Sequence, residues 1–390
     1  MHRALLAHTD EIDDVEYAIE DLMRQIDMSQ LLPNSVGIVY CDPGFYFSGV
    51  CKALNERLPF PVLGSTTITA AVSDSRVSQI LALMILTSDN LTFSVACSDE
   101  LKSGDDSVVE RCYAKAREGM EGEPALIMTY YPLVSDYDRD RMVDILSETS
   151  PGIPIYGTLT SSPALDSFTE ARIIYGDGGF NDRMSLLLIY GDIKPRFYLG
   201  TFSEEKYLKD KGVITAAEGN RIITINDIPA KDYLIRIGLS EDEAGNLLFP
   251  ELFPIFLDYN DGTLPYIRAM ITNLEDGSVI LNGGVRKGAA LSVGNIDVSD
   301  LQISVDRTLE AMKGEKGFSL AIFHSCAARY FVLFDYDVEI ETKAIKGNWE
   351  AGNLVPYIFC YSGGEICPVI NPDNTLTNRV HAYTISVCIF

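Results

Sequence analysis

Apolar residues recur along this chain in two ways: short continuous runs that predict buried strands, and stripes at helical spacing that predict helices. The strands predicted in the first hundred residues are Arg3–His8, Val36–Cys41, Pro61–Thr66, Val77–Leu86 and Leu91–Cys97. Residues 10–31 and 48–58 carry helical stripes, and Thr9 or Asp10 is expected to cap the first helix. The alternation predicts an α/β protein with an α+β tendency, in which mixed sheets pack with helices.

The order of elements then begins again. Residues 7–12 (AHTDEI) are answered by residues 96–101 (ACSDEL), and residues 62–66 (VLGST) by residues 155–159 (IYGTL). Predicted helices at 107–119 and 139–148 alternate with predicted strands at 125–131 and 153–158 in the same sequence of types. We therefore predict an N-terminal domain over residues 1–195 that duplicates a βαβαββ unit, with repeats at about 1–90 and 91–195.

Two hairpins are expected in this domain. The runs Val77–Leu86 and Leu91–Cys97 are separated by the polar residues 87–90, which favours a tight turn. Residues 172–175 and 184–190 flank Gly176-Asp-Gly-Gly179, which is also typical of a hairpin turn.

Residues 196–390 are predicted to form a second domain with a different order of elements. Three short strands at 255–258, 266–272 and 278–282 alternate with turn signals and indicate a β-meander. A helix is expected over Ser299–Lys313, opened by a capping box of Ser299 and Gln302. The corner Tyr361–Glu365 is similar to residues 64–66, so this half is interpreted as a decorated relative of the first.

The stretch Phe318–Tyr330 (FSLAIFHSCAARY) carries the most suggestive chemistry. Its apolar first half predicts a buried strand, and a helix is expected to follow with Ser325 as its N-cap. Free backbone N–H groups and the positive helix end at such a turn can hold an anion or stabilise a thiolate. Cys326 and Arg329, three residues apart, would share one helix face.

Each residue of this candidate site also has a structural interpretation. Cys326 is either a nucleophile, redox sensor or ligand contact, or a buried structural thiol. Arg329 either clamps a ligand carboxylate or pairs with a surface acid. Glu365 either receives a ligand ammonium or is a solvated loop carboxylate. An arginine and a glutamate at converging strand ends would suit a zwitterion such as an amino acid.

Other polar residues give weaker signals. Arg268 interrupts an apolar run, which strand alternation explains as well as a binding site does. His324 and His381 suggest a Cys/His hydrolase together with Cys326, although such a site is defined by geometry that spacing alone does not supply. The chain has four histidines and no ligand-spaced cluster, so neither a metal nor a cofactor is expected.

Composition narrows the classes of partner. The net charge of −25 would repel nucleic acid and anionic membranes, so neither is an expected partner. The longest apolar run, Ile80–Leu86, is too short to span a bilayer, and membrane insertion is not expected. The eight dispersed cysteines, with no secretion signal and no C-x-x-C pair, indicate reduced thiols in a cytoplasmic protein.

Several separated motifs resemble one known family. The pairing of residues 324–330 (HSCAARY) with 360–369 (CYSGGEICPV) resembles the C-terminal FIST domain, and so do residues 212–234 and 266–291. Residues 36–45 (VGIVYCDPGF) with 61–67 (PVLGSTT) resemble the N-terminal FIST domain. Two positions depart from the family pattern: Ala382 replaces a polar residue near the last strand, and Ala70–Ala71 stand in place of a Gly–Glu corner.

The resemblance implies an intracellular sensory module of bacterial-type signal transduction that binds a small polar ligand, with amino acids as candidates. No kinase, cyclase or receptor segment is recognisable, so the signal is expected to pass to a separate output protein, and the chain itself is not expected to be an enzyme. The residues expected to bind the ligand are Ser325, Cys326, Arg329, Tyr361, Ser362, Gly364, Glu365 and Arg268. Two alternatives stay open: a thiol-dependent enzyme using Cys326, and an interaction scaffold without a ligand.

Overall fold

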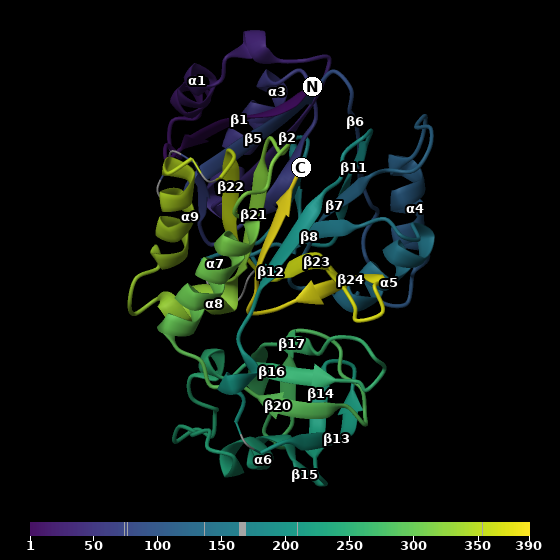
Figure 1. The fold of residues 1–390 in the computed structure, drawn as a ribbon, viewed down its shortest axis with the longest axis vertical. Helices are drawn as coiled ribbons and strands as arrows, with labels where there is room; N and C mark the ends of the chain where they lie inside the picture. Colours follow the sequence, from purple (N-terminus) through teal and green to yellow (C-terminus); the bar gives the residue numbers. More distant parts are fainter. Residues whose placement is uncertain (74, 76, 136, 164–168, 209, 353) are drawn as a thin grey trace.

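The computed structural model describes residues 1–390 except 74, 76, 136, 164–168, 209 and 353. It has a body of three mixed sheets with helices on their outer sides and, below the body in Figure 1, a separate β-rich module. The predicted α/β class is confirmed. The α-helices are α1 (Val15–Gln25), α2 (Pro43–Phe47), α3 (Val50–Arg57), α4 (Ser107–Ala116), α5 (Arg139–Thr149), α6 (Ala230–Arg236), α7 (Val298–Met312), α8 (Ala327–Leu333) and α9 (Ile340–Glu350).

The three sheets of the body share one strand order. In each sheet the last strand of a repeat lies between the first and second strands of that repeat and pairs with both. In the first sheet this order is β1 (His2–Thr9), β5 (Leu81–Ser88), β2 (Asn34–Cys41) and β3 (Val62–Thr66). In the second it is β6 (Thr92–Cys97), β11 (Ser185–Tyr190), β7 (Leu126–Tyr131) and β8 (Ile155–Leu159). In the third it is β12 (Arg196–Gly200), β25 (Ile385–Ile389), β21 (Ala321–Cys326) and β22 (Tyr357–Ser362).

Each sheet is completed by strands from a different repeat. The strand β4 (Ala70–Val72) pairs with β22, the hairpin of β9 (Ile173–Tyr175) and β10 (Gly178–Phe180) pairs with β3, and the hairpin of β23 (Glu365–Ile370) and β24 (Leu376–His381) pairs with β8. The three repeats therefore interlock in a closed cycle. This order agrees with the interpretation of the second half as a decorated relative of the first, while the domain boundary at residue 195 stays a prediction.

Both predicted hairpins are wrong. The strand β5 pairs with β1 and β2, whereas β6 pairs with β11, so neighbours in sequence lie in different sheets. The strand β9 pairs with β10, and β11 inserts between β6 and β7. The strand β5 closes the first repeat and β6 opens the second, while the hairpin of β9 and β10 leaves the second repeat and joins the first sheet. A local turn signal does not reveal either change of sheet.

Two helix starts also differ from expectation. Helix α1 begins at Val15, where the Asp14 carboxylate accepts a hydrogen bond from the Tyr17 amide at 3.0 Å, and not at residue 10. Helix α7 has its capping box at Asp297 and Asp300, two residues before the predicted pair. In both helices an aspartate is the cap, because its charged oxygen is a stronger acceptor for the free amides than a hydroxyl.

Two glycines allow the parallel strands to lie close together. A Cβ on Gly64 would stand 1.8 Å from the carbonyl oxygen of Val39, and a Cβ on Gly157 would stand 2.1 Å from that of Thr129. The repeated Gly of the VLGST and IYGTL words thus has a steric cause at equivalent places in two sheets.

The three sheets meet in one apolar core with a polar centre. Tyr40 on β2 and His324 on β21 are joined by a hydrogen bond of 2.6 Å between the Tyr40 hydroxyl and Nε2, and the Tyr130 ring on β7 lies 6.2 Å from that of Tyr40. The Nδ1 atom of His324 is 3.0 Å from the carbonyl oxygen of Gly157. Burial lowers the pKa of His324 to about 3, so this histidine is neutral and structural.

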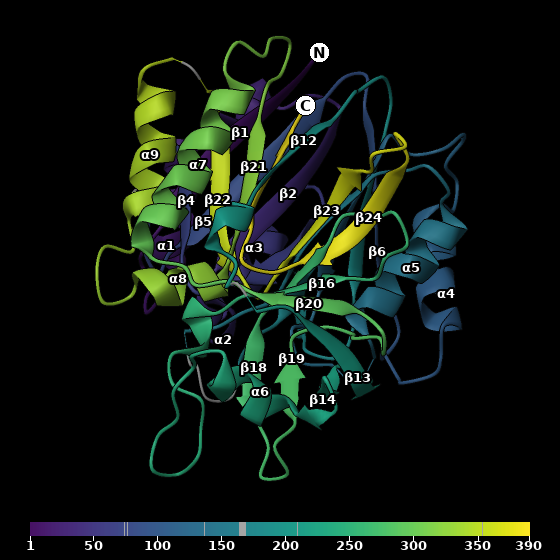
Figure 2. The ribbon, with the colours of Figure 1, turned by 60° about the horizontal axis from the view of Figure 1, so that its bottom comes forward.

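Residues 201–297, here called the inserted module, interrupt the third repeat between β12 and α7. Its strands are β13 (Gly212–Glu218), β14 (Arg221–Ile225), β15 (Ile228–Pro229), β16 (Ile255–Asp258), β17 (Tyr266–Arg268), β18 (Met270–Asn273), β19 (Val279–Leu281) and β20 (Ala290–Val293). Figure 2 shows these strands and α6 forming a unit that projects from the body. Its two connections pair with each other, through Leu208 N–H to Val293 O at 2.7 Å and Asn295 N–H to Lys206 O at 2.9 Å.

Short 3₁₀ helices lie at η1 (Met28–Gln30), η2 (Glu204–Lys206) and η3 (Pro250–Leu252).

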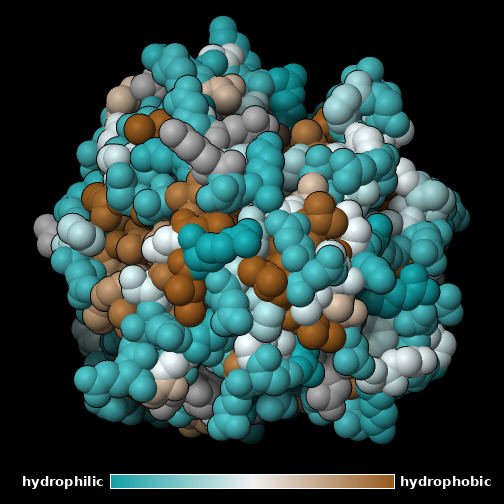
Figure 3. Space-filling view, turned by 90° about the horizontal axis from the view of Figure 1, so that it is seen from below, coloured by the Kyte–Doolittle hydropathy of each residue, from teal (hydrophilic) through white to brown (hydrophobic). Residues whose placement is uncertain are grey.

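Seen from the module end, apolar side chains gather near the middle of the face and polar ones cover its rim (Figure 3). Within the described residues, no helix combines the length and apolar character needed to cross a bilayer.

Candidate functional site

The structure brings the predicted residues Cys326, Arg329 and Glu365 together at the end of β21. The Cys326 amide donates to the Thr384 carbonyl at 3.0 Å, and the Thr384 hydroxyl donates to Oε2 of Glu365 at 2.5 Å. The side chains are sealed, however: Cys326 is 2% exposed, and Arg329 and Glu365 are 0% exposed. These three residues form a buried cluster in this structure, with no opening to solvent at their side chains.

Arg329 is fully engaged by the protein. Its Nε donates to Oε1 of Glu341 at 2.7 Å, Nη1 donates to the Tyr383 carbonyl at 3.2 Å, and Nη2 donates to the Ser304 hydroxyl at 2.8 Å. Ser325 donates its hydroxyl to the other Glu341 oxygen at 2.6 Å, and therefore does not cap α8 as expected. The guanidinium holds α7, α8 and α9 together through Glu341, which is fully buried and is therefore not the surface acid considered for this residue.

The remaining residues of the corner are also internally bonded. The Ser362 hydroxyl donates to the carbonyl oxygen of Gly364 at 3.1 Å, and the Tyr361 hydroxyl donates to the Val338 carbonyl at 3.3 Å. Gly364 accepts from the Leu159 amide at 2.9 Å, so it ties β22 to the second sheet. Their assignment as ligand contacts stays a prediction.

Burial governs the ionisation of Glu365. Loss of solvent raises the pKa of its carboxyl group to about 8, although hydrogen bonding by Thr384 and the charge of Arg329 oppose this shift. The group is therefore largely protonated at neutral pH. A neutral acid is a poor partner for a ligand ammonium.

Cys326 lacks the environment of a reactive thiol. Burial and the neighbouring Glu365 raise its pKa well above the usual value, and hydrogen bonds from the backbone of Tyr383 and Ala328, with the charge of Arg329, lower it only in part. His381 lies elsewhere, with Nε2 at 2.9 Å from the carbonyl oxygen of Cys367. The predicted Cys/His arrangement is not formed by Cys326 with either His324 or His381.

We expect the folded protein to resist thiol reagents, because all eight cysteines are buried and the thiolate is the reactive form. With Ellman's reagent at neutral pH, no thiol should react at the rate of a free peptide thiol, and all eight should react in denaturant. Peptide mapping after brief alkylation identifies any exception. Fast labelling of Cys326 would revive the thiol-enzyme alternative.

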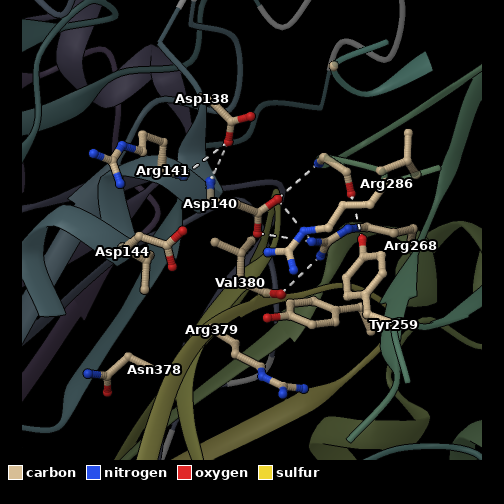
Figure 4. A pocket seen from close by; sticks show the side chains of 15 residues that line it. Asp138, Asp140, Arg141, Asp144, Tyr259, Arg268, Arg286, Asn378, Arg379 and Val380 are labelled. Atoms are coloured by element: carbon tan, nitrogen blue, oxygen red, sulfur yellow. Dashed lines mark hydrogen bonds and ion pairs between the residues drawn. The ribbon is translucent and has the colours of Figure 1, made fainter. Parts of the chain in front are cut away.

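Arg268 is not part of this cluster and instead lines an open pocket of about 300 Å³ between the body and the inserted module. Figure 4 shows the residues that contribute to it. From the body come α5 and β24, and from the module come β17 and the loops around residues 259 and 284. The lining residues are Asp138, Asp140, Arg141, Val143, Asp144, Gly219, Tyr259, Tyr266, Arg268, Gly284, Val285, Arg286, Asn378, Arg379 and Val380.

Asp140 forms the polar contact between the two sides of this pocket. Both of its carboxylate oxygens accept from Nη2 of Arg268, at 3.0 and 2.9 Å, and Oδ2 also accepts from the Gly284 amide at 2.9 Å. Arg268 is 2% exposed and donates through Nη1 to the Val380 carbonyl at 3.1 Å. Asp140, Arg268 and Gly284 are called the Asp140 contact below.

Most other charges of the pocket are also paired. Arg141 donates from Nε and Nη2 to Asp106 at 3.0 and 2.7 Å, and Asp138 caps α5. Arg379 stacks 4.2 Å from the centre of the Tyr266 ring and donates through Nη1 to the Leu264 carbonyl at 2.5 Å. These side chains shape the walls and leave few charges free for a ligand.

Asp144, Arg286 and Arg379 are less completely engaged. Within the described residues the Asp144 carboxylate makes no hydrogen bond; burial and the nearby Asp140 raise its pKa, while the charges of Arg141 and Arg286 act against this shift. Arg286 makes no side-chain hydrogen bond there either; it lies over the Tyr259 ring at 4.6 Å and forms a loose ion pair with Asp261 at 4.0 Å. Nε and Nη2 of the buried Arg379 also have no hydrogen-bond partner among the described residues. Asp144 comes from α5 and Arg286 from the module, so two opposite charges without hydrogen bonds lie on the two sides of one hollow (Figure 4).

Sequence reasoning missed every residue of this pocket except Arg268. Asp138, Asp140 and Asp144 were interpretable only as the polar face of a helix, and the turn Gly283–Gly284 only as a strand connection. No group of three His, Cys, Asp or Glu residues suited to a metal ion occurs within the described part of the chain.

Comparisons with known proteins place these observations in a family. The FIST N domain model matches residues 35–228, and the FIST C domain model matches residues 230–368. No curated protein matches the sequence significantly. The junction between the two models lies inside the inserted module, next to β15.

Among solved structures, a crystal structure of cyanuric acid hydrolase from A. caulinodans covers 100% of this chain and 99% of its own, at 8% identity and a TM-score of 0.38. The structure of T. maritima PurL complexed with ATP covers 100% and 71%, at 9% identity and a TM-score of 0.18. Scores this low say nothing about function. The two domain matches, which run in order over most of the sequence, show that the chain belongs to the FIST family, whose domains generally serve as sensors in signal transduction.

Proposed function

We propose that this chain is an intracellular sensor that binds a small polar ligand in the pocket between α5, β24 and the inserted module, and that it passes the signal to a separate output protein. The observation that carries the proposal is that two opposite charges, Asp144 and Arg286, line one open hollow and make no side-chain hydrogen bond among the described residues. A ligand with both an anionic and a cationic group satisfies both residues, and an amino acid is the simplest such molecule.

The size and walls of the pocket suit this class of ligand. A hollow of about 300 Å³ lies at the lower end of the range for small-molecule sites. Val143, Val285 and Val380 supply apolar surface, while the Tyr259 and Tyr266 rings supply flat walls beside the charges. Arg286 can meet a carboxylate with two parallel N–H groups, which gives orientation as well as affinity.

The buried cluster at β21 supports a structural role better than a binding role. Arg329 is neutralised by Glu341, and Glu365 is protonated at neutral pH. A ligand there would have to displace an internal ion pair and open the core. For this reason we place the ligand in the pocket lined by Arg268, and not in the cluster of Cys326, Arg329 and Glu365.

The proposal is tested by thermal unfolding with the twenty common L-amino acids offered one at a time. A ligand that binds only the folded chain stabilises it by about 2.7 kcal/mol at a hundred times its Kd, which is several degrees in Tm. In Asp144→Asn and Arg286→Gln the affinity should fall by about tenfold or more, because each loses a charge-assisted hydrogen bond. Isothermal titration measures this loss.

The matched controls change the same residue types on exposed surface away from the pocket, as Asp177→Asn and Arg307→Gln. These variants should bind as the wild type does. The proposal fails if no amino acid raises Tm, or if binding persists unchanged in both pocket variants. Binding that is lost only on opening the Arg329–Glu341 pair would return the site to the buried cluster.

A further inference from the structure

The pocket has walls from two parts of the molecule that are only partly joined. The body supplies α5 and β24, and the inserted module supplies β17 and the loops at residues 259 and 284. The module also rests on the body through an apolar contact, where Phe256, Ile267 and Ile296 join the core of the third sheet. The pocket side, in contrast, is held by polar groups, chiefly the Asp140 contact.

We propose that ligand occupancy of this pocket is converted into tighter attachment of the inserted module to the body, and that this attachment is the signal. The inference rests on the proposed function and adds the way in which that site acts. A ligand that bridges Asp144 on α5 and Arg286 on the module binds only when both walls are in place. By linkage, it shifts the equilibrium toward the attached state.

The Asp140 contact sets how far the empty protein opens. Its three hydrogen bonds are few, and the Asp140 side chain remains 23% exposed, so water competes for it. Asp140 and Asp144 lie one helical turn apart on α5, and their charges influence each other.

One glycine allows the contact to be disturbed without removing any charge. A Cβ on Gly283 would stand 2.7 Å from Nε of Arg268 and 2.9 Å from Oδ2 of Asp140. A Cβ on the exposed Gly347 of α9, away from the pocket, would meet no atom within 4 Å. Gly283→Ala should therefore separate Arg268 from Asp140, and Gly347→Ala is its matched control.

Hydrogen exchange of the full-length protein tests the inference at a place outside the pocket. Helix η3 belongs to the module, does not line the pocket, and lies against the body, where the Tyr383 hydroxyl donates to the Pro250 carbonyl at 3.3 Å. Its amides include Leu252 and Phe253, which donate to Phe249 and Pro250. Exchange over residues 249–253 thus reports attachment and not ligand contact.

Gly283→Ala should speed exchange over residues 249–253 by about tenfold or more, the effect of losing one charge-assisted hydrogen bond on an opening equilibrium. Gly347→Ala should exchange over these residues as the wild type does. An equimolar mixture of the twenty L-amino acids should slow exchange over 249–253 in the wild type, by up to about a hundredfold at a hundred times Kd. It should have little effect in Arg286→Gln.

The outcomes separate the two proposals. If the mixture raises Tm but leaves exchange over 249–253 unchanged, the inference is overturned and the proposed function stands. If neither Tm nor exchange responds, both are overturned. Equal exchange in Gly283→Ala and Gly347→Ala would also overturn the inference, because the Asp140 contact would then not govern attachment.

Discussion

Replacing Glu341 with glutamine should lower the free energy of unfolding by roughly 3–5 kcal/mol, the usual cost of leaving one member of a buried ion pair alone. Glu341 and Arg329 are both 0% exposed, and the carboxylate also accepts from Ser325. The guanidinium cannot lose its proton, so in Glu341→Gln it stays charged in the core without a counter-ion. Urea unfolding measures the loss.

The matched control is Glu310→Gln, which removes a carboxylate from an exposed pair with Lys313 at 3.2 Å. That change should alter stability by less than about 0.5 kcal/mol, because solvent screens exposed pairs. The double variant Arg329→Met, Glu341→Gln should regain part of the loss, since no buried charge remains unpaired. A loss below about 1 kcal/mol in the single variant would show that the core opens readily, which would restore Arg329 as a candidate ligand contact.

Much of the local structure could be predicted from the sequence because it depends on neighbouring residues. A buried strand and a helix that begins directly after Cys326 are present as the pattern of residues 318–330 indicates, although β21 begins at Ala321 and includes His324, Ser325 and Cys326, which were expected in the turn. The repeated word around Gly64 and Gly157 marks the same close strand approach in two sheets. Such signals need only a few residues to be recognisable.

The exchange of strands between repeats could not be predicted in this way. Nothing in the sequence of Leu81–Ser88 indicates whether this strand pairs with the strand that follows it or with β1 and β2, which lie some forty to eighty residues earlier. Burial on both faces makes each pairing equally compatible with the apolar pattern. The sheet order is set by how three repeats close on one another, a property of the whole chain.

The partners of the charged residues at the candidate site could not be predicted from the sequence either. Arg329 looked free in the sequence because its partner, Glu341, stands twelve residues later on another helix. Conversely, the walls of the pocket come from residues near 140, 260–286 and 380, and only the fold brings them together. Whether an arginine is available to a ligand depends on which acid the tertiary structure places beside it, and spacing along the chain does not carry that information.

Glu365 should make the protein less stable as the pH rises from about 4.5 to 8, and Glu365→Gln should remove this dependence. The carboxyl group has a pKa of about 8 in the folded chain against 4.5 in the unfolded chain, chiefly because it is buried. Between these values the folded state binds more protons than the unfolded state, so stability decreases with rising pH. The full effect, reached above pH 8, is on the order of 4–5 kcal/mol at 1.36 kcal/mol per pKa unit.

Urea unfolding at pH 5, 7 and 9 measures the difference between Glu365→Gln and the wild type, in which the contributions of His324 and His381 cancel because both proteins contain them. The variant should be close to the wild type at pH 5 and more stable at pH 9, since glutamine resembles the protonated acid and can still accept from Thr384. Glu310→Gln, at an exposed position, should show no such trend. A constant difference at all three values would mean that Glu365 is ionised throughout, and the buried cluster would then hold a carboxylate capable of receiving a cationic ligand.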